Sequence, residues 1–427
     1  MIEVPSPPAP GFFDALETRS VQARERALAA ALPGVIAAAQ RTPAQAQSLA
    51  DVDAACIDSR RALAKLPVTR KPALLEQQKT LRKTDPFGGY SAIGWRGLRD
   101  LSGAQRVYQS PGPIYEPEGR SHDYWRIARA LTAAGFQSGD LIHNSFSYHL
   151  TPGAWMMESG AQALGCTVFP GGVGNTELQL QAICDLRPDG YCGTPSFLRI
   201  LLEKAQESGL ALPSLRKALL SGEAFPPSLR DWLAGRGIQG YQAYATADVG
   251  LIAYETAARE GLVIDEGVIV EIVRAGTGEP VPDGEVGEVV VTVLHHEYPL
   301  VRFGTGDLSA VMPGTCPTGR TNGRIKGWMG RADQTAKVRG MFVHPSQVAD
   351  VLRRHPGIGR ARLVVEGEMA NDRMTLHAET AVAADHLREA LAASVRDVTK
   401  LRCEVRLVGP GTLPNDGKVI EDARKYA

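Results

Sequence analysis

The sequence predicts an α/β protein with a large N-terminal domain of mixed and parallel sheets wrapped by helices, and a small C-terminal α/β domain. Three observations predict this fold. Apolar strands alternate with helices from about residue 120 to 235, a β-rich portion follows, and a new pattern of helices and strands starts after about residue 330. Because 427 residues exceed what one hydrophobic core usually serves, we predict two domains, 1–332 and 333–427.

The alternating region predicts a parallel sheet. Its apolar strands read DLIHNSF, CTVFPGG and GYCG, and its helices read YWRIARALTAAG, GAWMMESGAQALG, ELQLQAICDL and FLRILLEKAQESG. Strands separated by helices of this length pair in parallel, with the helices on the faces of the sheet. Ligand sites in such sheets lie beyond the carboxyl ends of the strands, where the Gly- and Pro-rich loops of this chain fall.

Two further regions complete the predicted fold. Residues 17–82 have apolar positions at helical spacing and predict a helical lead-in. The segments EGVIVEIV and EVVVTVL, joined by a turn-rich loop, predict an antiparallel hairpin. In the C-terminal region, SQVADVLRR and DHLREALAASVRDV predict helices, and ARLVVE, MTLHAE and CEVRLV predict strands.

The composition excludes several classes of partner. The 47 basic residues balance the 47 acidic ones, which leaves no overall field to attract nucleic acid or an anionic membrane. No stretch reaches the roughly 18 apolar residues that a membrane helix needs, and no secretion signal is recognisable, so we expect a cytoplasmic protein. The six cysteines form no CxxC pair, and Cys316 has no cysteine near it, so no structural zinc is expected.

Eight segments match one protein family in their order along the chain. They read LAKLPVTRKPAL, DPFGG, PGGVGNTELQLQAICDLRPD, TPSFL, VRFGTGDLS, CPTGR, GRADQTAKVRGMFVHPSQV and LPNDGKVIED. Together they resemble the landmarks of phenylacetate-coenzyme A ligases, a branch of the adenylate-forming enzymes that includes acyl-coenzyme A synthetases and luciferases. The resemblance implies the adenylate-forming fold, with a mobile C-terminal domain.

The resemblance also implies a reaction in two halves. A carboxylate attacks the α-phosphate of ATP to give an acyl-adenylate and pyrophosphate, and coenzyme A then displaces AMP. Because the first half brings an anion to a polyanion, it needs positive charge and a magnesium ion near the transferring phosphorus.

Two residues of the C-terminal region match moving parts of that family. Lys418, in PNDGKVI, matches the lysine that contacts the carboxylate and the α-phosphate during adenylation, although an exposed tail lysine is the plain alternative. Asp333 falls where the family places its hinge, at which the small domain would rotate between an adenylating and a thioester-forming pose. A simple linker residue would look the same.

Several segments match the nucleotide site of the family. Asp307, in FGTGDLS, matches the acid that binds the ribose hydroxyls, and Arg331, in GRAD, matches a second ribose contact. The plain alternative for Asp307 is a turn-forming residue after glycine. Gly222, Glu223 and Ala224, in SGEAF, would lie along the adenine, or form an ordinary loop at the end of a strand.

The segment YATADVG, which begins with Tyr244 and Ala245, matches the place where an aromatic ring covers the adenine and an acid carries magnesium. Asp248 stands where the family has a glutamate. A shorter carboxylate still suits magnesium, which is a hard ion satisfied by oxygen ligands.

The phosphate loop departs from the family. Relatives carry a Ser/Thr/Gly-rich run that ends in Gly-Lys-Pro, whose amides wrap the phosphates. This chain has SPGPIYEP instead, in which Ser110, Gly112 and Pro117 agree and Glu116 places a negative charge where a lysine is expected. A competing hypothesis is therefore a degenerate relative that binds nucleotide or acyl-coenzyme A with little or no adenylation.

The segment SFSYHLTPGAW falls where the family builds its pocket for an aryl acid. Its candidate lining residues are Phe146, Tyr148, His149 and Trp155. An apolar cavity with a few polar groups suits an aromatic acid, and ordinary packing between a strand and a helix is the alternative.

The predicted activity is ATP-dependent ligation of a phenylacetate-like carboxylic acid to coenzyme A, with magnesium as cofactor and a homodimer left open. An oxidoreductase is disfavoured because no GxGxxG follows a predicted strand.

Overall fold

The computed structural model describes residues 11–98, 101–274, 277–332, 334–367, 371–381, 384–414 and 418–424. The chain forms two compact units. The first contains the residues up to Ser221 and Arg236–Trp328, and the second contains Gly222–Gly235 and the residues from Met329 onward. Asp333 lies outside the described residues, and the domain limits 1–332 and 333–427 stay a prediction.

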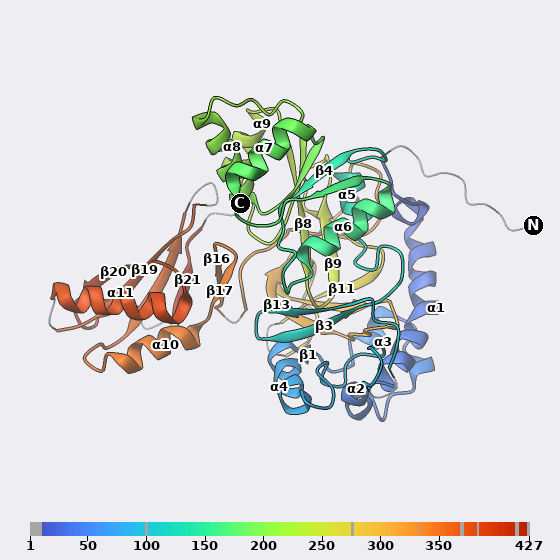
Figure 1. The fold of residues 1–427 in the computed structure, drawn as a ribbon. Helices are drawn as coiled ribbons and strands as arrows, with labels where there is room; N and C mark the ends of the chain where they lie inside the picture. Colours follow the sequence, from blue (N-terminus) through green and yellow to red (C-terminus); the bar gives the residue numbers. More distant parts are fainter. Residues whose placement is uncertain are drawn as a thin grey trace, which may run out of the picture. The chain divides into compact units, whose positions relative to one another are not determined.

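The N-terminal segment is helical, as predicted. Its helices are α1 Val21–Gln40, α2 Pro43–Ser48, α3 Arg60–Leu63 and α4 Lys71–Leu81 (Figure 1). The Ser20 hydroxyl caps α1 by accepting a hydrogen bond from the amide of Ala23 at 3.1 Å. Leu28, Leu32 and Val35 lie on one face of α1 and are buried in a cluster that includes Ile269 of the β-rich portion. The long helix is thus anchored by its apolar face.

The largest sheet of the first unit has nine strands, in the order β14-β15-β10-β9-β8-β7-β6-β4-β5. One half is parallel and contains β4 Leu141–Asn144, β5 Thr167–Pro170, β6 Gly190–Gly193, β7 Lys217–Leu220 and β8 Gln239–Thr246. The other half is antiparallel and contains β9 Gly250–Glu255, β10 Leu262–Ile264, β14 Val311–Met312 and β15 Arg324–Ile325. The predicted parallel sheet is confirmed, and antiparallel strands extend it.

The helices of the parallel half are α5 Ala128–Ala133, α6 Gly153–Leu164, α7 Thr176–Leu186 and α8 Pro195–Glu207. Strand β5 lies on one side of β4 and β6 lies on the other, so the chain reverses direction across the sheet at β4. Right-handed crossovers therefore carry α6 on one face and α7 with α8 on the opposite face. Figure 1 shows α5 beside α6 and α7 beside α8, which are also in contact. Ligands of such sheets bind where the strand order reverses, beyond the carboxyl ends of the strands.

A second sheet of four strands has the order β1-β13-β12-β11. Its strands are β1 Thr69–Arg70, β11 Val268–Val273, β12 Gly287–Val293 and β13 Phe303–Ser309. Strands β11 and β12 are antiparallel, which confirms the predicted hairpin. A separate two-stranded hairpin contains β2 Arg106–Ser110 and β3 Ile114–Glu118, and α4 contacts both β3 and β13.

Buried ion pairs connect distant segments of the first unit. Asp265, which follows β10, accepts hydrogen bonds from Arg126 Nε at 2.9 Å and from Arg129 Nη1 at 2.8 Å. The Gly267 amide donates a third bond to the same carboxylate at 2.9 Å. Both oxygens of Asp265 are therefore satisfied inside the protein, as burial of a charge requires.

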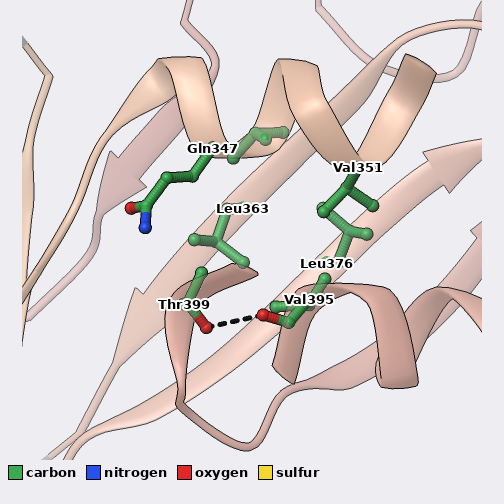
Figure 2. A pocket seen from close by; sticks show the side chains of 7 residues that line it. Gln347, Val351, Leu363, Leu376, Val395 and Thr399 are labelled. Atoms are coloured by element: carbon green, nitrogen blue, oxygen red, sulfur yellow. Dashed lines mark hydrogen bonds between the residues drawn. The ribbon is translucent and has the colours of Figure 1, made fainter. Parts of the chain in front are cut away.

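The second unit contains the hairpin of β16 Ala336–Val338 and β17 Met341–Val343, and a sheet of order β20-β19-β18-β21. The strands of this sheet are β18 Ala361–Glu366, β19 Arg373–Glu379, β20 Glu404–Val408 and β21 Ile420–Asp422, and the helices are α9 Pro227–Ala234, α10 Pro345–Arg354 and α11 Asp385–Thr399. Each helix and strand predicted for the C-terminal region is present. Side chains of α10, α11, β18 and β19 surround a cavity of about 10 Å³, room for about one water molecule (Figure 2). This cavity is a packing gap in the core of the unit.

None of the helices in the described ranges is both long enough and apolar enough to cross a lipid bilayer.

Candidate nucleotide and acid site

Tyr244 and Asp307 come together although 63 positions separate them in the sequence. The Tyr244 hydroxyl, near the end of β8, donates to Asp307 Oδ2 in β13 at 2.8 Å. Trp328 Nε1 donates to Asp307 Oδ1 at 3.1 Å. Two donors, one on each oxygen, therefore fix the direction of the Asp307 carboxylate.

Asp248 lies between β8 and β9, and its side chain is only 1% exposed. Lys71, the first residue of α4, places its ammonium 2.7 Å from Asp248 Oδ2. Asp248 Oδ1 is buried and has no hydrogen-bond partner among the described residues. One oxygen of the Asp248 carboxylate is thus paired, and the other has no donor in the part of the chain that the structure describes.

The segment matched to the phosphate loop forms the β2–β3 hairpin. Ser110 pairs with Ile114, so the turn between the strands contains only three residues, including Gly112. Glu116 lies within β3, beyond this turn, and its side chain is buried. The Ser110 hydroxyl donates to Glu116 Oε1, whereas Glu116 Oε2 has no partner in the described part of the chain.

Helix α4 fixes this hairpin against the Asp248 region. Gln78 lies two turns after Lys71, and its side-chain amide bonds both backbone groups of Tyr115, donating to the carbonyl and accepting from the amide at 2.8 Å each. Leu74, between them, is fully buried. Lys71, Leu74 and Gln78 are spaced by three and four residues, so one face of α4 holds Asp248 at one end and β3 at the other.

The surroundings of Glu116 disfavour its charged form. Burial raises the pKa of Glu116 to about 8, and the negative charge of Asp248 adds to the increase, while Lys71 and the Ser110 hydroxyl oppose it. Tyr298 has its hydroxyl buried without a partner within the described ranges. Its pKa is raised well above the ordinary value, first by burial and then by the charges of Asp248 and Glu116.

Asp248 suits magnesium on structural grounds, because its buried Oδ1 has no donor from the described residues and carboxylate oxygen is the ligand that this ion prefers. No group of three or more His, Cys, Asp or Glu side chains that could hold a metal occurs in the described ranges. Cys316, considered above for zinc, is buried with its sulfur 3.1 Å from Thr318 Oγ1.

The candidate acid-binding residues follow β4, the strand at which the sheet order reverses. Tyr148 accepts a hydrogen bond from Asn144 Nδ2 at 3.0 Å and donates one to Glu158 Oε2 at 2.9 Å. Trp155 contacts the Tyr148 ring edge to face, with centroids 5.2 Å apart. Phe146 packs against the core of the sheet. This part of the predicted pocket therefore contains adjacent aromatic rings on a polar network.

His149, the fourth predicted residue, is exposed. A different histidine occupies the interior: His143 in β4 stacks on Phe169, with ring centroids 5.2 Å apart. Its Nε2 lies 2.7 Å from Gln179 Oε1, and burial lowers its pKa, which favours the neutral ring. Gln179 also donates to the carbonyl groups of Gly172 and Gly174, so α7 orders the glycine-rich loop after β5.

The predicted residues of the second unit lie on short connections. Lys418 is exposed and lies two residues before β21. The next amide, that of Val419, donates to Gln334 Oε1 at 2.8 Å, which ties the backbone beside Lys418 to the segment that follows position 333. Arg331 places its guanidinium 5.9 Å from the centre of the Phe342 ring in β17. Asp333 itself lies outside the described residues.

The segment predicted to lie along the adenine belongs to the second unit. Gly222 has a φ of +83°, a backbone conformation that favours glycine. A Cβ atom placed on Gly340 would lie 3.9 Å from Glu223 Oε1, so the turn after β16 passes close to this segment. Ala224 is half-buried.

Lys71, Tyr298 and Trp328 are among the residues of these groupings to which the sequence analysis gave no role. Lys71 lies in LAKLPVTRKPAL, one of the matching segments, which is a signal that pointed to it. Trp328 precedes the GRAD segment by two positions, but nothing in the spacing relates it to Asp307. Tyr298 has no sequence signal that distinguishes it from a core tyrosine.

The AMP-binding enzyme family matches residues 147–293, and the C-terminal domain of AMP-binding enzymes matches residues 340–423. A phenylacetate-coenzyme A ligase of Thermus thermophilus is 33% identical to the chain, over 70% of this chain and 75% of that protein. A phenylacetate-coenzyme A ligase of Pseudomonas putida is 28% identical, over 95% of both proteins.

The fold resembles that of solved structures. A 2-hydroxyisobutyryl-CoA ligase in complex with 2-HIB-AMP and CoA is 25% identical, with a TM-score of 0.81 over 98% of this chain and 94% of that one. The amide bond synthetase McbA of Marinactinospora thermotolerans, 19% identical with a TM-score of 0.53 over 93% of this chain and 92% of that one, shares the fold. The chain belongs to the phenylacetate-coenzyme A ligase family of AMP-binding enzymes.

Proposed function

We propose that this protein ligates an aromatic, phenylacetate-like carboxylic acid to coenzyme A, using ATP and passing through an acyl-adenylate. Its relatives of the same family are named phenylacetate-coenzyme A ligases. The observation that carries the proposal is the 2.8 Å hydrogen bond between Tyr244 and Asp307, two residues expected at adenine and ribose. Both residues were expected at the nucleotide from separate matching segments, and their direct contact supports a shared nucleotide site.

Asp307 would bind the ribose hydroxyls. Tyr244 and Trp328 each donate to one of its oxygens, which holds the carboxylate in a single orientation before the nucleotide arrives. A carboxylate held in this way loses little further freedom on binding, so less of the binding energy is spent on ordering it. Arg331 and the segment Gly222–Ala224 are proposed as further nucleotide contacts.

Asp248 would hold magnesium through the oxygen that lacks a donor in the described part of the chain. When bound, the ion supplies positive charge for the phosphate oxygens of ATP. Lys71 adds an ammonium group beside Asp248, where it limits the net negative charge that ATP must approach.

The acid would lie beyond the carboxyl end of β4, beside Phe146, Tyr148 and Trp155. Ring-on-ring contact suits an aryl group, and the hydrogen bonds of Tyr148 to Asn144 and Glu158 hold its ring in place. His149 is proposed as a residue at the mouth of the pocket, in line with its exposure.

Lys418 would deliver its ammonium group to the meeting point of the carboxylate and the α-phosphate. An exposed lysine must be carried to that point, so we propose that residues 333–427 form a domain that rotates at Asp333 and also admits coenzyme A. The hydrogen bond from Val419 to Gln334 supports this idea, because it links the segment after the hinge to the backbone beside the lysine.

The competing hypothesis of a binder without adenylation activity gains no support from the relatives named above, which are all ligases or synthetases. It does make a distinct prediction, which is that no pyrophosphate forms from ATP and any acid.

Pyrophosphate release and thioester formation from ATP, magnesium, coenzyme A and a panel of aryl and short aliphatic acids would test the proposal. We expect turnover with phenylacetate-like acids, and we expect Lys418→Ala to slow it by roughly 10²–10³-fold. Lys400→Ala is the matched control, because Lys400 is an exposed lysine of the same unit that pairs with Asp397 at the end of α11. Absence of pyrophosphate with every acid, or equal loss in both variants, would contradict the proposal.

A further inference from the structure

Strand β2 contacts the segment of the proposed acid pocket at two points. The guanidinium carbon of Arg106, the first residue of β2, lies 4.2 Å from the centre of the Trp155 ring. The backbone amide of Gln109 donates to the carbonyl of Leu150 at 2.8 Å. Leu150 and Trp155 both belong to SFSYHLTPGAW. Arg106 and Gln109, to which the sequence analysis gave no role, therefore border this segment.

A buried carboxylate holds Arg106 in place. Arg106 lies opposite Glu118 in the β2–β3 hairpin, and its Nη1 donates to both oxygens of Glu118, at 3.1 Å and 3.2 Å. The Tyr108 hydroxyl donates to the same carboxylate. The side chain of Glu118 is 3% exposed, and that of Arg106 is 33% exposed. Because the guanidinium is already oriented by this pair, it loses little further freedom by covering a ring.

Several contacts hold Trp155 in one orientation. Arg106 covers a face of its indole ring, and the Tyr148 ring meets it edge to face, with centroids 5.2 Å apart. Trp155 Nε1 donates to the Tyr148 carbonyl at 3.4 Å. A cation is attracted by the electron-rich face of an aromatic ring, and indole is the best such partner among the side chains. Removal of the cation would therefore loosen both rings.

We propose that Arg106 is a positioning residue of the acid site, which acts through Trp155 and favours aryl acids over short aliphatic ones. Fixed rings offer a flat aryl group their contact area without first having to be ordered, whereas a short aliphatic acid gains little from contact with a ring. This inference rests on the proposed function, because it takes Trp155 and Tyr148 as walls of the acid site.

Steady-state kinetics of Arg106→Met test the proposal, since methionine keeps an unbranched apolar stem and removes the cation. We expect the KM for phenylacetate to rise by roughly three- to tenfold, while kcat and the KM for ATP stay within about twofold of the wild type. The ratio of kcat/KM for phenylacetate to that for propionate should fall by a similar factor. Arg106→Met combined with Glu118→Gln should behave in the same way, and it leaves no buried carboxylate without its counter-charge if the single variant does not fold.

Arg259→Met is the matched control. Arg259 lies 3.9 Å from the centre of the Tyr241 ring and pairs with Glu255, and the two side chains are 27% and 8% exposed. The same kinds of contact are thus lost outside the proposed site, so we expect the KM for phenylacetate to equal that of the wild type.

A double-mutant cycle distinguishes positioning from a separate effect on the site. If Arg106 acts through Trp155, Arg106→Met should not raise the KM for phenylacetate further in a Trp155→Leu background. An unchanged KM in an active Arg106→Met variant, an equal rise in Arg259→Met, or full additivity with Trp155→Leu would overturn this inference and leave the proposed ligation standing. Absence of turnover by the wild type with every acid would contradict the proposed ligation, and this inference with it.

Discussion

Asp265 and Asp248 are both buried carboxylates of the first unit, yet their surroundings differ in kind. Asp265 accepts from two arginines and a backbone amide, so both of its oxygens are satisfied within the protein. Asp248 accepts from Lys71 on one oxygen, and its other oxygen has no donor in the described ranges. Arginine binds a carboxylate with several donors in a fixed plane, whereas a lysine ammonium on a flexible stem can move aside for a ligand.

The same contrast recurs within one strand. Glu118 is paired with Arg106 at 3.1 Å and accepts from Tyr108, while Glu116 accepts from the Ser110 hydroxyl on one oxygen and has no partner on the other among the described residues. A carboxylate whose oxygens all accept hydrogen bonds from the protein holds segments together. A carboxylate with an oxygen that lacks a protein donor is available to bind a ligand. The four predictions that follow test this distinction.

Asp265→Asn should have the largest effect, and it should be on stability. The substitution removes the counter-charge of Arg126 and one of the two carboxylates that pair with Arg129, the other being Asp14, so we expect the free energy of unfolding to fall by roughly 3–5 kcal/mol. Urea denaturation followed by circular dichroism measures the change. A decrease in the free energy of unfolding of less than about 1 kcal/mol would mean that solvent or other groups neutralise the charges of the two arginines. That result would contradict the contrast between Asp265 and Asp248.

Asp248→Asn should change activity rather than stability. We expect pyrophosphate release to slow by roughly 10²–10³-fold, because the proposed magnesium ligand loses its charge. The free energy of unfolding should change by only about 1 kcal/mol, since a partly exposed lysine pair contributes little. Steady-state kinetics and urea denaturation of the same preparation separate the two effects, and a large stability loss with normal turnover would reverse our assignment.

Glu116→Gln should stabilise the metal-free protein at alkaline pH. The folded protein holds the Glu116 proton up to a pKa of about 8, whereas the ordinary value is 4.5, so the stability from this proton is complete below pH 4.5 and is lost as the pH rises through 8. Glutamine does not ionise, so the variant should be more stable than the wild type by roughly 1–3 kcal/mol at pH 8.5 and nearly equal at pH 5. Urea denaturation of the wild type and the variant in EDTA, at pH 5 and at pH 8.5, measures the difference in their free energies of unfolding. The same difference at both pH values would contradict the prediction.

Tyr244→Phe should have the smallest effect. The ring remains, but Asp307 loses one donor, so the carboxylate is held less firmly for the ribose. A typical hydrogen bond contributes about 0.5–1.5 kcal/mol, which corresponds to a KM for ATP that rises by roughly two- to tenfold. Initial-rate kinetics with varied ATP would show it. Tyr241→Phe is a control on the same strand, because the Tyr241 ring faces Arg259 and lies outside the proposed site.

Much of the fold could be predicted from local patterns in the sequence. The alternating segments between residues 120 and 235 became the parallel half of the nine-stranded sheet, and EGVIVEIV and EVVVTVL paired as predicted. The C-terminal helices and strands also follow from their periodicity. These features depend on residues close together in sequence, so the sequence alone contains the signal.

Other features had no local signal. The sequence analysis assigned no strands at β9, β10, β14 and β15, which extend the sheet of the parallel strands on one side. It interpreted Glu116 as part of a loop, whereas the residue lies within β3 and faces the interior. Strand pairing and the direction of a side chain depend on neighbours that are distant along the chain. A local pattern of residue types cannot identify those neighbours.

The sequence by itself determined the family, the order of helices and strands, and the residue types available for binding a nucleotide, because each depends on short motifs and on periodicity. The tertiary structure alone decided which of those residues meet. Lys71 reaches Asp248 across 177 positions, and Tyr244 reaches Asp307 across 63. Which buried carboxylates are saturated and which keep an oxygen open is decided by contacts between distant segments, since burial and donor geometry exist only once the chain has folded.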